Sequence, residues 1–182
     1  MVARELLGMR LVRLLNGVRV SGTIVETEAY RGEEDLACHA RHGKTPRTAV
    51  MYGEAGRAYI YFTYGMHWLL NVVTGEVNFP AAVLIRAIVP VEGISLVARN
   101  RQGKPQKHWC DGPAKICQSL QIDGSLNGIC LTGPGSALWI EEGQPFPDDH
   151  VTTTKRIGIE SVSEPWKSIP WRFVTSVKEK VS

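Results

Sequence analysis

The sequence predicts an α+β fold, in which a curved, mainly antiparallel β-sheet carries a protruding β-hairpin and is surrounded by helices. Segments with strand patterning outnumber those with helical spacing, and the two kinds do not alternate as they do around a parallel sheet. Two of the strand segments are divided by turn residues, which is typical of antiparallel hairpins. Because the 182 residues contain no internal repeat or linker, we expect residues 1–182 to form a single domain.

The first predicted hairpin covers residues 9–25 and continues into a row of candidate site residues. Apolar and polar residues alternate around Asn16 and the glycine after it, a dipeptide that tolerates the positive φ angles of a type I′ turn. Side chains alternate between the two faces of a strand. We therefore expect Glu26, Glu28 and Tyr30 on the same face of the second strand.

The remaining elements follow from local signals. Residues 39–47 are polar and basic and are expected to form a loop, because Pro46 holds the residue before it out of helical geometry. Residues 57–73 are aromatic and β-branched, and Gly65 divides them into a second hairpin. Strand patterns also cover residues 82–91, 137–140, 156–159 and 171–174, and helical spacing covers 91–101 and 112–122.

Charge and cysteine content narrow the class of protein. The formal net charge of +3 is compatible with a polyanionic partner but does not identify one. The four cysteines lack CxxC spacing, so we expect reduced thiols and no zinc site. No secretory leader opens the chain, and the apolar runs are shorter than the roughly 18 residues of a membrane span. These features predict a soluble intracellular protein with no membrane partner, in the cytoplasm or nucleoid of a bacterium or the nucleus of a eukaryote.

Glu26 and Glu28 are the first candidates for chemistry. Two carboxylates at alternate positions of a strand most often belong to a solvated face. Here Tyr30 follows on the same face, and a loop with His39 comes next. This combination suits a cleft wall where a carboxylate activates water, so a solvated face and a catalytic site both remain open at this point.

A series of tyrosines is the second candidate: Tyr52, Tyr59, Tyr61 and Tyr64. A strand tyrosine ordinarily packs in or near the core, and Tyr59 and Tyr61 share a face. Tyr64, however, falls at the expected tip of the second hairpin, where packing explains a large ring poorly. An exposed ring at a tip suits a wedge inserted between stacked bases.

Arg86 is the third candidate because it lies within the apolar run VLIRAIV. An arginine buried without a partner costs several kcal/mol. We therefore expect a carboxylate partner, either in a structural ion pair or within a site.

Basic residues in the loops are the fourth candidate: Arg41, Lys44, Arg47 and Lys115. Such residues are ordinarily solvated surface. Lys115, however, falls in the first turn of a predicted helix, which suits phosphate oxygens. The segment from Gly112 is not a P-loop, because the glycine spacing of GxxxxGK[ST] is absent.

Five motifs occur in order along the chain: VETEAYRGEEDLACHA, TPR, YIYFTYGMHWLLNVV, VLIRAIVPVEG and DGPAKICQSL. In this order they resemble the alkyladenine (3-methyladenine, methylpurine) DNA glycosylase family over nearly the whole chain. The resemblance implies a monofunctional glycosylase of base excision repair. Such an enzyme flips alkylated or deaminated purines out of duplex DNA (3-methyladenine, 7-methylguanine, hypoxanthine and ethenoadenine) and hydrolyses the N-glycosidic bond.

The resemblance also implies roles for the residues at matching positions. Glu28 corresponds to the general base that activates the attacking water, and Arg86 to the basic residue that helps to hold that water and the glutamate. Tyr30, His39 and Tyr61 correspond to the pocket that sandwiches the extruded base, and Asn71 to the residue that disfavours the amino group of guanine. Tyr64 corresponds to the intercalating wedge. The positions that touch DNA correspond to Thr45, Met66 and Lys115.

The partner that the resemblance implies is double-stranded DNA with a damaged purine, bound by a monomer that needs no metal and no cofactor. Three features depart from the family pattern: His67 beside the expected wedge, a longer loop over residues 74–80, and no basic extension before Arg4. They leave the chemistry in place but affect the DNA footprint. Two alternatives stay open, namely a non-catalytic nucleic-acid-binding module of the same fold and a small-molecule nucleoside hydrolase.

Overall fold

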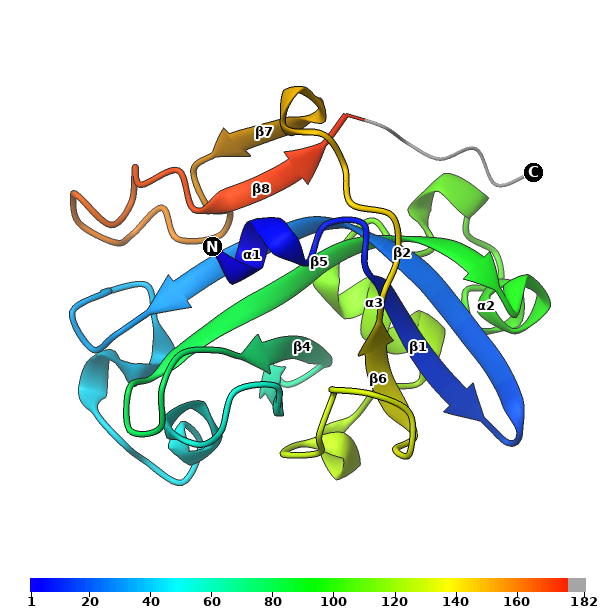
Figure 1. Ribbon diagram of the computed structural model, residues 1–182, viewed down its shortest axis with the longest axis horizontal. Coiled ribbons are helices and arrows are strands. Elements are labelled where there is room, and N and C mark those ends of the chain that lie inside the picture. The colour runs from blue at the N-terminus through cyan, green and yellow to red at the C-terminus, as the bar shows by residue number, and fades with distance from the viewer. Residues whose placement is uncertain (177–182) are drawn as a thin grey trace.

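The computed structural model of the protein describes residues 1–176 (Figure 1). Within them the strands are β1 (Arg10–Leu15), β2 (Val18–Arg31), β3 (Ala58–Thr63), β4 (His67–Val73), β5 (Ala81–Glu92), β6 (Leu138–Glu141), β7 (Val151–Thr154) and β8 (Arg172–Thr175). The α-helices are α1 (Val2–Glu5), α2 (Ile94–Asn100) and α3 (Pro113–Leu120). Short 3-10 turns cover His39–His42, Ala49–Tyr52, Gln106–His108, Gly124–Leu126 and Asp148–His150.

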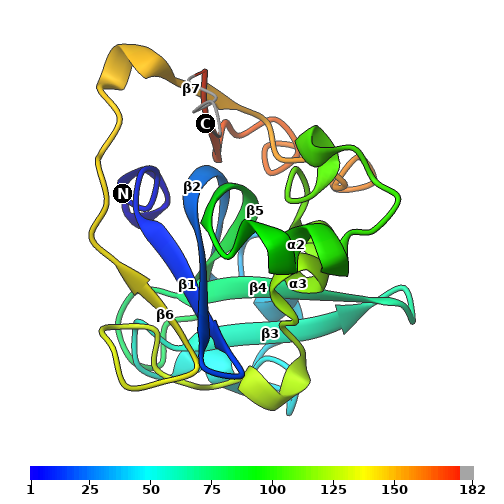
Figure 2. The same cartoon turned by 90° about the vertical axis from the view of Figure 1, so that its right-hand side faces the viewer.

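The strands form one sheet in the order β3-β4-β5-β2-β1-β6, and β8 pairs with both β2 and β7. The pairings between these strands are antiparallel. The sheet curls strongly, so that in Figure 2 the β3–β4 hairpin runs crosswise to the long strands β1 and β2, over their lower half in the view. The predicted α+β fold with a curved, mainly antiparallel sheet is confirmed.

The long strand β2 organises the sheet. On one side it pairs with β5, and on the other it pairs first with β1 and then, at Glu26–Glu28, with β8. The register of β2 against β5 shifts on both sides of Glu26. Such bulges re-aim side chains and increase the local twist. The two candidate carboxylates therefore lie on an irregular stretch of strand where β8 replaces β1 as the neighbour.

Both predicted hairpins are present. In the first, Asn16 and Gly17 have φ angles of 49° and 80°, as a type I′ turn requires. In the second, Tyr64 and Gly65 have φ angles of 51° and 66°, and the Met66 amide donates to the Thr63 carbonyl at 3.1 Å. Figure 2 shows the tip of this β3–β4 hairpin projecting beyond the rest of the molecule.

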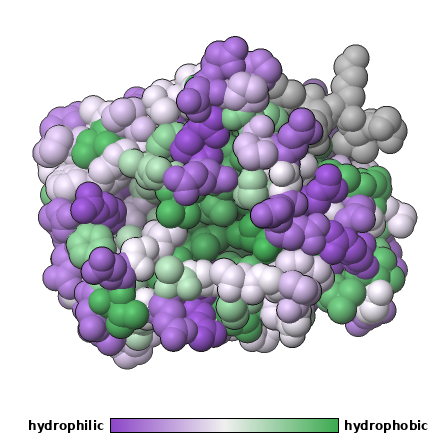
Figure 3. All heavy atoms as spheres, in the orientation of Figure 1, coloured by the Kyte–Doolittle hydropathy of each residue, from purple (hydrophilic) through white to green (hydrophobic). Residues whose placement is uncertain are grey.

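Two clusters of buried side chains support the sheet. The main core lies between the sheet and the helices and includes Leu11, Ile85 and Leu120. A second cluster contains Met51 and Tyr59 and supports the partly buried rings of the site. On the face viewed in Figure 3, apolar side chains gather in a central hollow with polar side chains around it. The described part of the chain contains no helix long and apolar enough to cross a membrane.

One predicted strand, at 156–159, is wrong. The strand of this region is β7, which pairs with β8 and has Thr152 and Thr153 on its exposed positions. Residues 156–159 form no regular element, because Arg156 is drawn into a buried ion pair and Gly158 has a φ angle of 79°, which an extended strand excludes.

The helix expected over 91–101 also begins later than predicted. Strand β5 runs on to Glu92, and α2 starts only after Gly93, whose left-handed φ angle of 68° turns the chain. A Cβ atom at Gly93 would lie 2.9 Å from the Arg19 carbonyl oxygen. The turn therefore requires glycine both for its φ angle and for this close approach. The break between strand and helix thus falls at a position that apolar spacing does not reveal.

Candidate functional site

A pocket of about 320 Å³ opens between the centre of the sheet, the β3–β4 hairpin and residues 157–159. This volume is within the usual range for ligand sites, roughly 300–1,000 Å³. A larger cavity of about 470 Å³ lies beside α1 and shares Tyr30 and Ala82 with the pocket. It contains none of the other predicted site residues, so we place the candidate site in the smaller pocket. Predicted residues that line this pocket are Tyr30, His39, Tyr61, Tyr64, Asn71 and Arg86.

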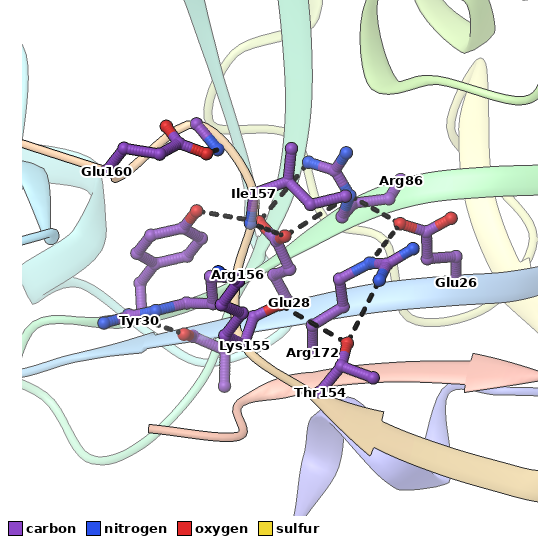
Figure 4. Close-up of polar contacts among 12 residues, drawn as sticks. Glu26, Glu28, Tyr30, Arg86, Thr154, Lys155, Arg156, Ile157, Glu160 and Arg172 are labelled. Carbon is purple, nitrogen blue, oxygen red and sulfur yellow. Dashed lines mark hydrogen bonds and ion pairs between the residues drawn. The ribbon is translucent and has the colours of Figure 1, made fainter. Parts of the chain in front are cut away.

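Glu28 lies directly behind the wall of the pocket and is completely buried. Its Oε2 accepts hydrogen bonds from the Tyr30 hydroxyl at 2.8 Å and from Arg86 at 3.4 Å, and its Oε1 accepts one from the Ile157 amide at 2.8 Å (Figure 4). Burial raises the pKa of Glu28 above its ordinary value, against the opposing effect of the Arg86 cation and the two hydrogen bonds. A buried carboxylate with a raised pKa beside a cleft is typical of catalytic acids and bases.

Arg86 has the carboxylate partners that its position in an apolar strand predicts. Its Nε donates to Glu26 Oε1 at 2.7 Å, in addition to the contact with Glu28. The same Glu26 oxygen accepts from Arg172 Nε at 2.7 Å, and Arg172 donates further to Thr154 at 3.0 Å. The site therefore contains a chain of alternating charges that joins β8, β2 and β5.

The pocket wall is aromatic. The rings of His39 and Tyr61 lie 4.4 Å apart and nearly perpendicular, and His39 Nδ1 lies 2.9 Å from the Tyr59 hydroxyl oxygen. Burial, together with the cations Arg47 and Arg41, lowers the pKa of His39 to about 4. The imidazole is therefore neutral at physiological pH. The structure thus brings the three predicted base-binding rings to one pocket.

The four candidate tyrosines divide between the core, the pocket wall and the tip of the second hairpin. Tyr52 and Tyr59 are buried in the second core cluster, and Tyr61 is half-buried in the pocket wall. Tyr64, at the tip, is 85% exposed and stands at the rim of the pocket. A ring this exposed adds little to the packing of the core. Packing therefore does not explain why a large aromatic residue stands at the tip.

Asn71 lies on β4 and is almost completely buried, yet it also lines the pocket. Its side-chain amide donates to the Tyr59 carbonyl oxygen at 3.0 Å. This bond fixes the orientation of the side chain at the pocket wall and satisfies a backbone group at the same time.

The three other predicted DNA contacts lie outside this pocket. Met66 is 65% exposed beside Tyr64 at the hairpin tip. Thr45 bonds to Thr48 at 3.0 Å and lines a neighbouring cavity of about 420 Å³ that also contains Arg41 and Arg47. Lys115, in the first turn of α3, forms an ion pair of 2.7 Å with Asp111.

The structure adds groups that the sequence analysis did not single out. The Ile157 amide binds Glu28, Arg172 binds Glu26, and Arg156 anchors the segment that carries Ile157. Arg156 opens the segment RIGI, for which the sequence predicts a strand, and the cost of burying a charge in such a strand would predict a partner for it, as it does for Arg86. A backbone amide, by contrast, leaves no signal in a sequence.

The chain is similar in sequence to known proteins over its whole length. Residues 1–179 match the family model described as methylpurine-DNA glycosylase. A relative from Carboxydothermus hydrogenoformans is 48% identical over 181 residues, which cover 100% of this chain and 92% of the relative. A relative from Methanocella arvoryzae is 45% identical over 176 residues, which cover 94% of this chain and 84% of the relative. Both bear the name "Putative 3-methyladenine DNA glycosylase". A match over this length and at this identity shows that the chain belongs to the methylpurine-DNA glycosylase family.

Proposed function

We propose that this protein is a monofunctional DNA glycosylase that flips damaged purines out of duplex DNA and hydrolyses their N-glycosidic bond. The observation that carries the proposal is the buried Glu28, held by Arg86 behind an aromatic pocket whose rim bears the exposed Tyr64. Family membership supports the same reaction.

The pocket suits an extruded base. Extrusion costs a few kcal/mol, which weakened pairing at a damaged base reduces. Stacking against Tyr30, His39 and Tyr61 would offset this cost at about 1–3 kcal/mol per base–aromatic contact. Tyr64 would fill the gap left in the duplex, as an inserted side chain does in other proteins that unstack DNA.

The proposed chemistry rests on Glu28 in its ionised form. The carboxylate takes a proton from a water molecule, whose oxygen attacks the anomeric carbon as the purine leaves through a transition state with oxocarbenium character. Arg86 holds the carboxylate and the water. A purine alkylated at N3 or N7 is cationic, so aromatic walls attract it by charge as well as by shape. Since the described lining of the pocket includes no lysine, we propose hydrolysis without a Schiff base.

Substrate choice and DNA contacts complete the proposal. The substrates would be 3-methyladenine, 7-methylguanine, hypoxanthine and ethenoadenine, with Asn71 acting against the amino group of guanine. Thr45, Met66 and Lys115 would touch the DNA. We propose that the protein acts as a monomeric single domain, without metal or cofactor.

One observation favours a second candidate, a non-catalytic module that binds nucleic acid. Glu28 exposes no surface and already has three hydrogen-bond donors, as expected of a carboxylate that only closes an ion pair. In this alternative the tyrosines stack bases and no bond is broken.

A strand-scission assay separates the candidates. Duplexes with a single hypoxanthine or methylated purine are incubated with the protein and treated with hot alkali, which cleaves abasic sites. Scission at the lesion is the expected result. Tight binding of the lesion duplex without scission would favour the binding module, and cleavage of free nucleosides alone would favour a nucleoside hydrolase.

A further inference from the structure

Arg156 is the largest fully buried side chain of the described protein, although it is charged. Its guanidinium forms two bonds with Asp35, at 2.5 Å and 2.9 Å, and neither side chain is exposed. It also donates to the carbonyl oxygens of Ala29 at 3.0 Å and of Trp166 at 3.1 Å. One cation thus joins the end of β2, the loop after it and the chain segment before β8.

The same guanidinium also lies over two aromatic rings, one of which belongs to the candidate site. It lies 4.7 Å from the ring centroid of Tyr30 and 5.2 Å from that of Trp171. Tyr30 is the residue whose hydroxyl donates to Glu28. A cation held over this ring restrains the ring and hence the direction of its hydroxyl.

The residue after Arg156 donates its amide to Glu28 Oε1. Residues 155–159 form no helix or strand, so no backbone ladder holds this amide in place. The anchors nearest to it in the chain are the Arg156 bonds. Figure 4 shows Arg156 and Ile157 together beside Glu28 and Tyr30.

We propose that Arg156 is a positioning residue of the site, which holds the Ile157 amide and the Tyr30 hydroxyl on Glu28 and so keeps this carboxylate ionised and aimed. The inference rests on the proposed function of Glu28 as the base. A buried ion pair is weak evidence for stability by itself, since apolar side chains of similar volume often replace one at no loss. This pair, however, adjoins two of the three groups that donate to Glu28, the Tyr30 hydroxyl and the Ile157 amide. We therefore assign it to the positioning of these donors.

Removal of the pair is expected to move the acid limb of the pH–rate profile. The groups that face Glu28 are Glu26 and Tyr30 on β2, Arg86 on β5, Arg172 on β8 and the Ile157 amide. Both the Ile157 amide and the Tyr30 hydroxyl lower the pKa of Glu28. If they loosen, this pKa rises, and a larger share of the enzyme is protonated and inactive at low pH.

The test is a double variant, Arg156→Met with Asp35→Leu, which removes one positive and one negative charge and leaves no unpaired ion in the core. The expected shift of the acid limb in single-turnover hypoxanthine release is about one pH unit upward, a tenfold loss of rate below the limb. Hydrogen exchange of the Ile157 amide should accelerate at least about tenfold by the same argument. The control is Arg4→Met with Asp148→Leu, a more exposed pair of 2.7 Å whose arginine otherwise donates to the Phe146 carbonyl, and it should move neither measurement.

The outcomes are distinct. Suppose that the wild type is active and that the double variant has the same acid limb and the same rate of Ile157 amide exchange. Arg156 would then only fill the core. Should the double variant not fold, Arg156→Lys retains a cation beside Asp35 but loses the fork of donors, and its acid limb should move in the same direction. An inactive wild type would refute the proposed function instead, and the exchange measurement would still test the positioning.

Discussion

Arg86 lies 2.7 Å from Glu26 but 3.4 Å from Glu28, so its shorter ion pair is with the carboxylate that Arg172 also binds. Glu26 thus faces two cations at close range. Glu28 has one longer ionic contact, one hydroxyl and one backbone amide, and it is the more buried of the two. This division leaves Glu28 as the carboxylate whose pKa burial raises, and Glu26 as the group that holds Arg86.

The first prediction follows from this division. Glu28→Gln should lower base release by roughly 10²–10⁴, because the amide keeps the shape but cannot take a proton. Binding of a lesion duplex should stay within about tenfold, or 1.4 kcal/mol. The comparison variant, Glu26→Gln, should lower base release less than Glu28→Gln does, because it weakens the hold on Arg86 but leaves the base in place. Release by Glu28→Gln at a rate near that of the wild type would place the base elsewhere, with Glu26 next to be tested.

The pH dependence gives a second prediction. Burial raises the pKa of Glu28, so activity should rise with pH through a midpoint above the ordinary glutamate value. The pKa of His39 is lowered to about 4, so titration of this ring should add no second limb to the pH–rate profile near neutral pH. Single-turnover rates between about pH 4 and pH 9 would show both features. A limb near neutrality that disappears in His39→Gln would mean that the histidine titrates in the active enzyme.

A third prediction concerns the hairpin tip. Tyr64→Ala should weaken lesion binding by about 1–3 kcal/mol, because the inserted ring stabilises the extrahelical state. The loss should be larger for well-paired lesions than for mismatched ones. Stopped-flow fluorescence of an ethenoadenine duplex measures the extrusion. Val18→Ala removes an apolar group that is 47% exposed in the other hairpin, at the start of β2, and serves as the control. Unchanged extrusion in Tyr64→Ala would make Tyr64 an ordinary surface residue.

Salt dependence tests Lys115. Binding should weaken along a log–log slope of about −0.9 per neutralised phosphate on duplex DNA. Lys115→Ala should flatten this slope by about one contact and weaken lesion and undamaged DNA alike. In the free protein Asp111 holds Lys115 at 2.7 Å, so Asp111→Asn should release it and strengthen binding. A loss for lesion DNA alone would place Lys115 at the pocket instead.

The sequence predicted the two hairpins, the shared face of Glu26, Glu28 and Tyr30, and the partnered Arg86, because each depends on local periodicity or on the cost of one buried charge. The strand at 156–159 could not be excluded in this way. Its residues are apolar enough for a strand, but the φ angle of 79° at Gly158 and the long-range pair of Arg156 with Asp35 are known only from the structure. The Ile157 amide was beyond prediction for the same reason, since only tertiary structure brings it to Glu28.

Asn71→Ser asks whether the pocket can change its selectivity while its chemistry stays in place. Hypoxanthine and guanine differ by one exocyclic amine at C2, and a small steric conflict can exclude the larger base at a cost of roughly 1–3 kcal/mol. Asn71 lines the pocket, and its bond to the Tyr59 carbonyl fixes where the side chain lies. The shorter serine should therefore admit guanine. Release should be sooner from G·T mismatches than from G·C pairs, because weak pairing lowers the cost of extrusion.

The same bond supplies the competing explanation, in which Asn71 only satisfies a buried carbonyl on β3. Its loss would then cost about 1–3 kcal/mol of stability and leave base preference unchanged. Single-turnover release of both bases, with a melting curve for each protein, separates the two. Asn127 provides a matched control, because its side chain also bonds a backbone group of β3, the Ile60 amide at 2.9 Å, and it does not line the pocket. Asn127→Ser should lower the melting temperature alone. If Asn71→Ser behaves in the same way, with an unaltered ratio of hypoxanthine to guanine release, Asn71 is not a gate.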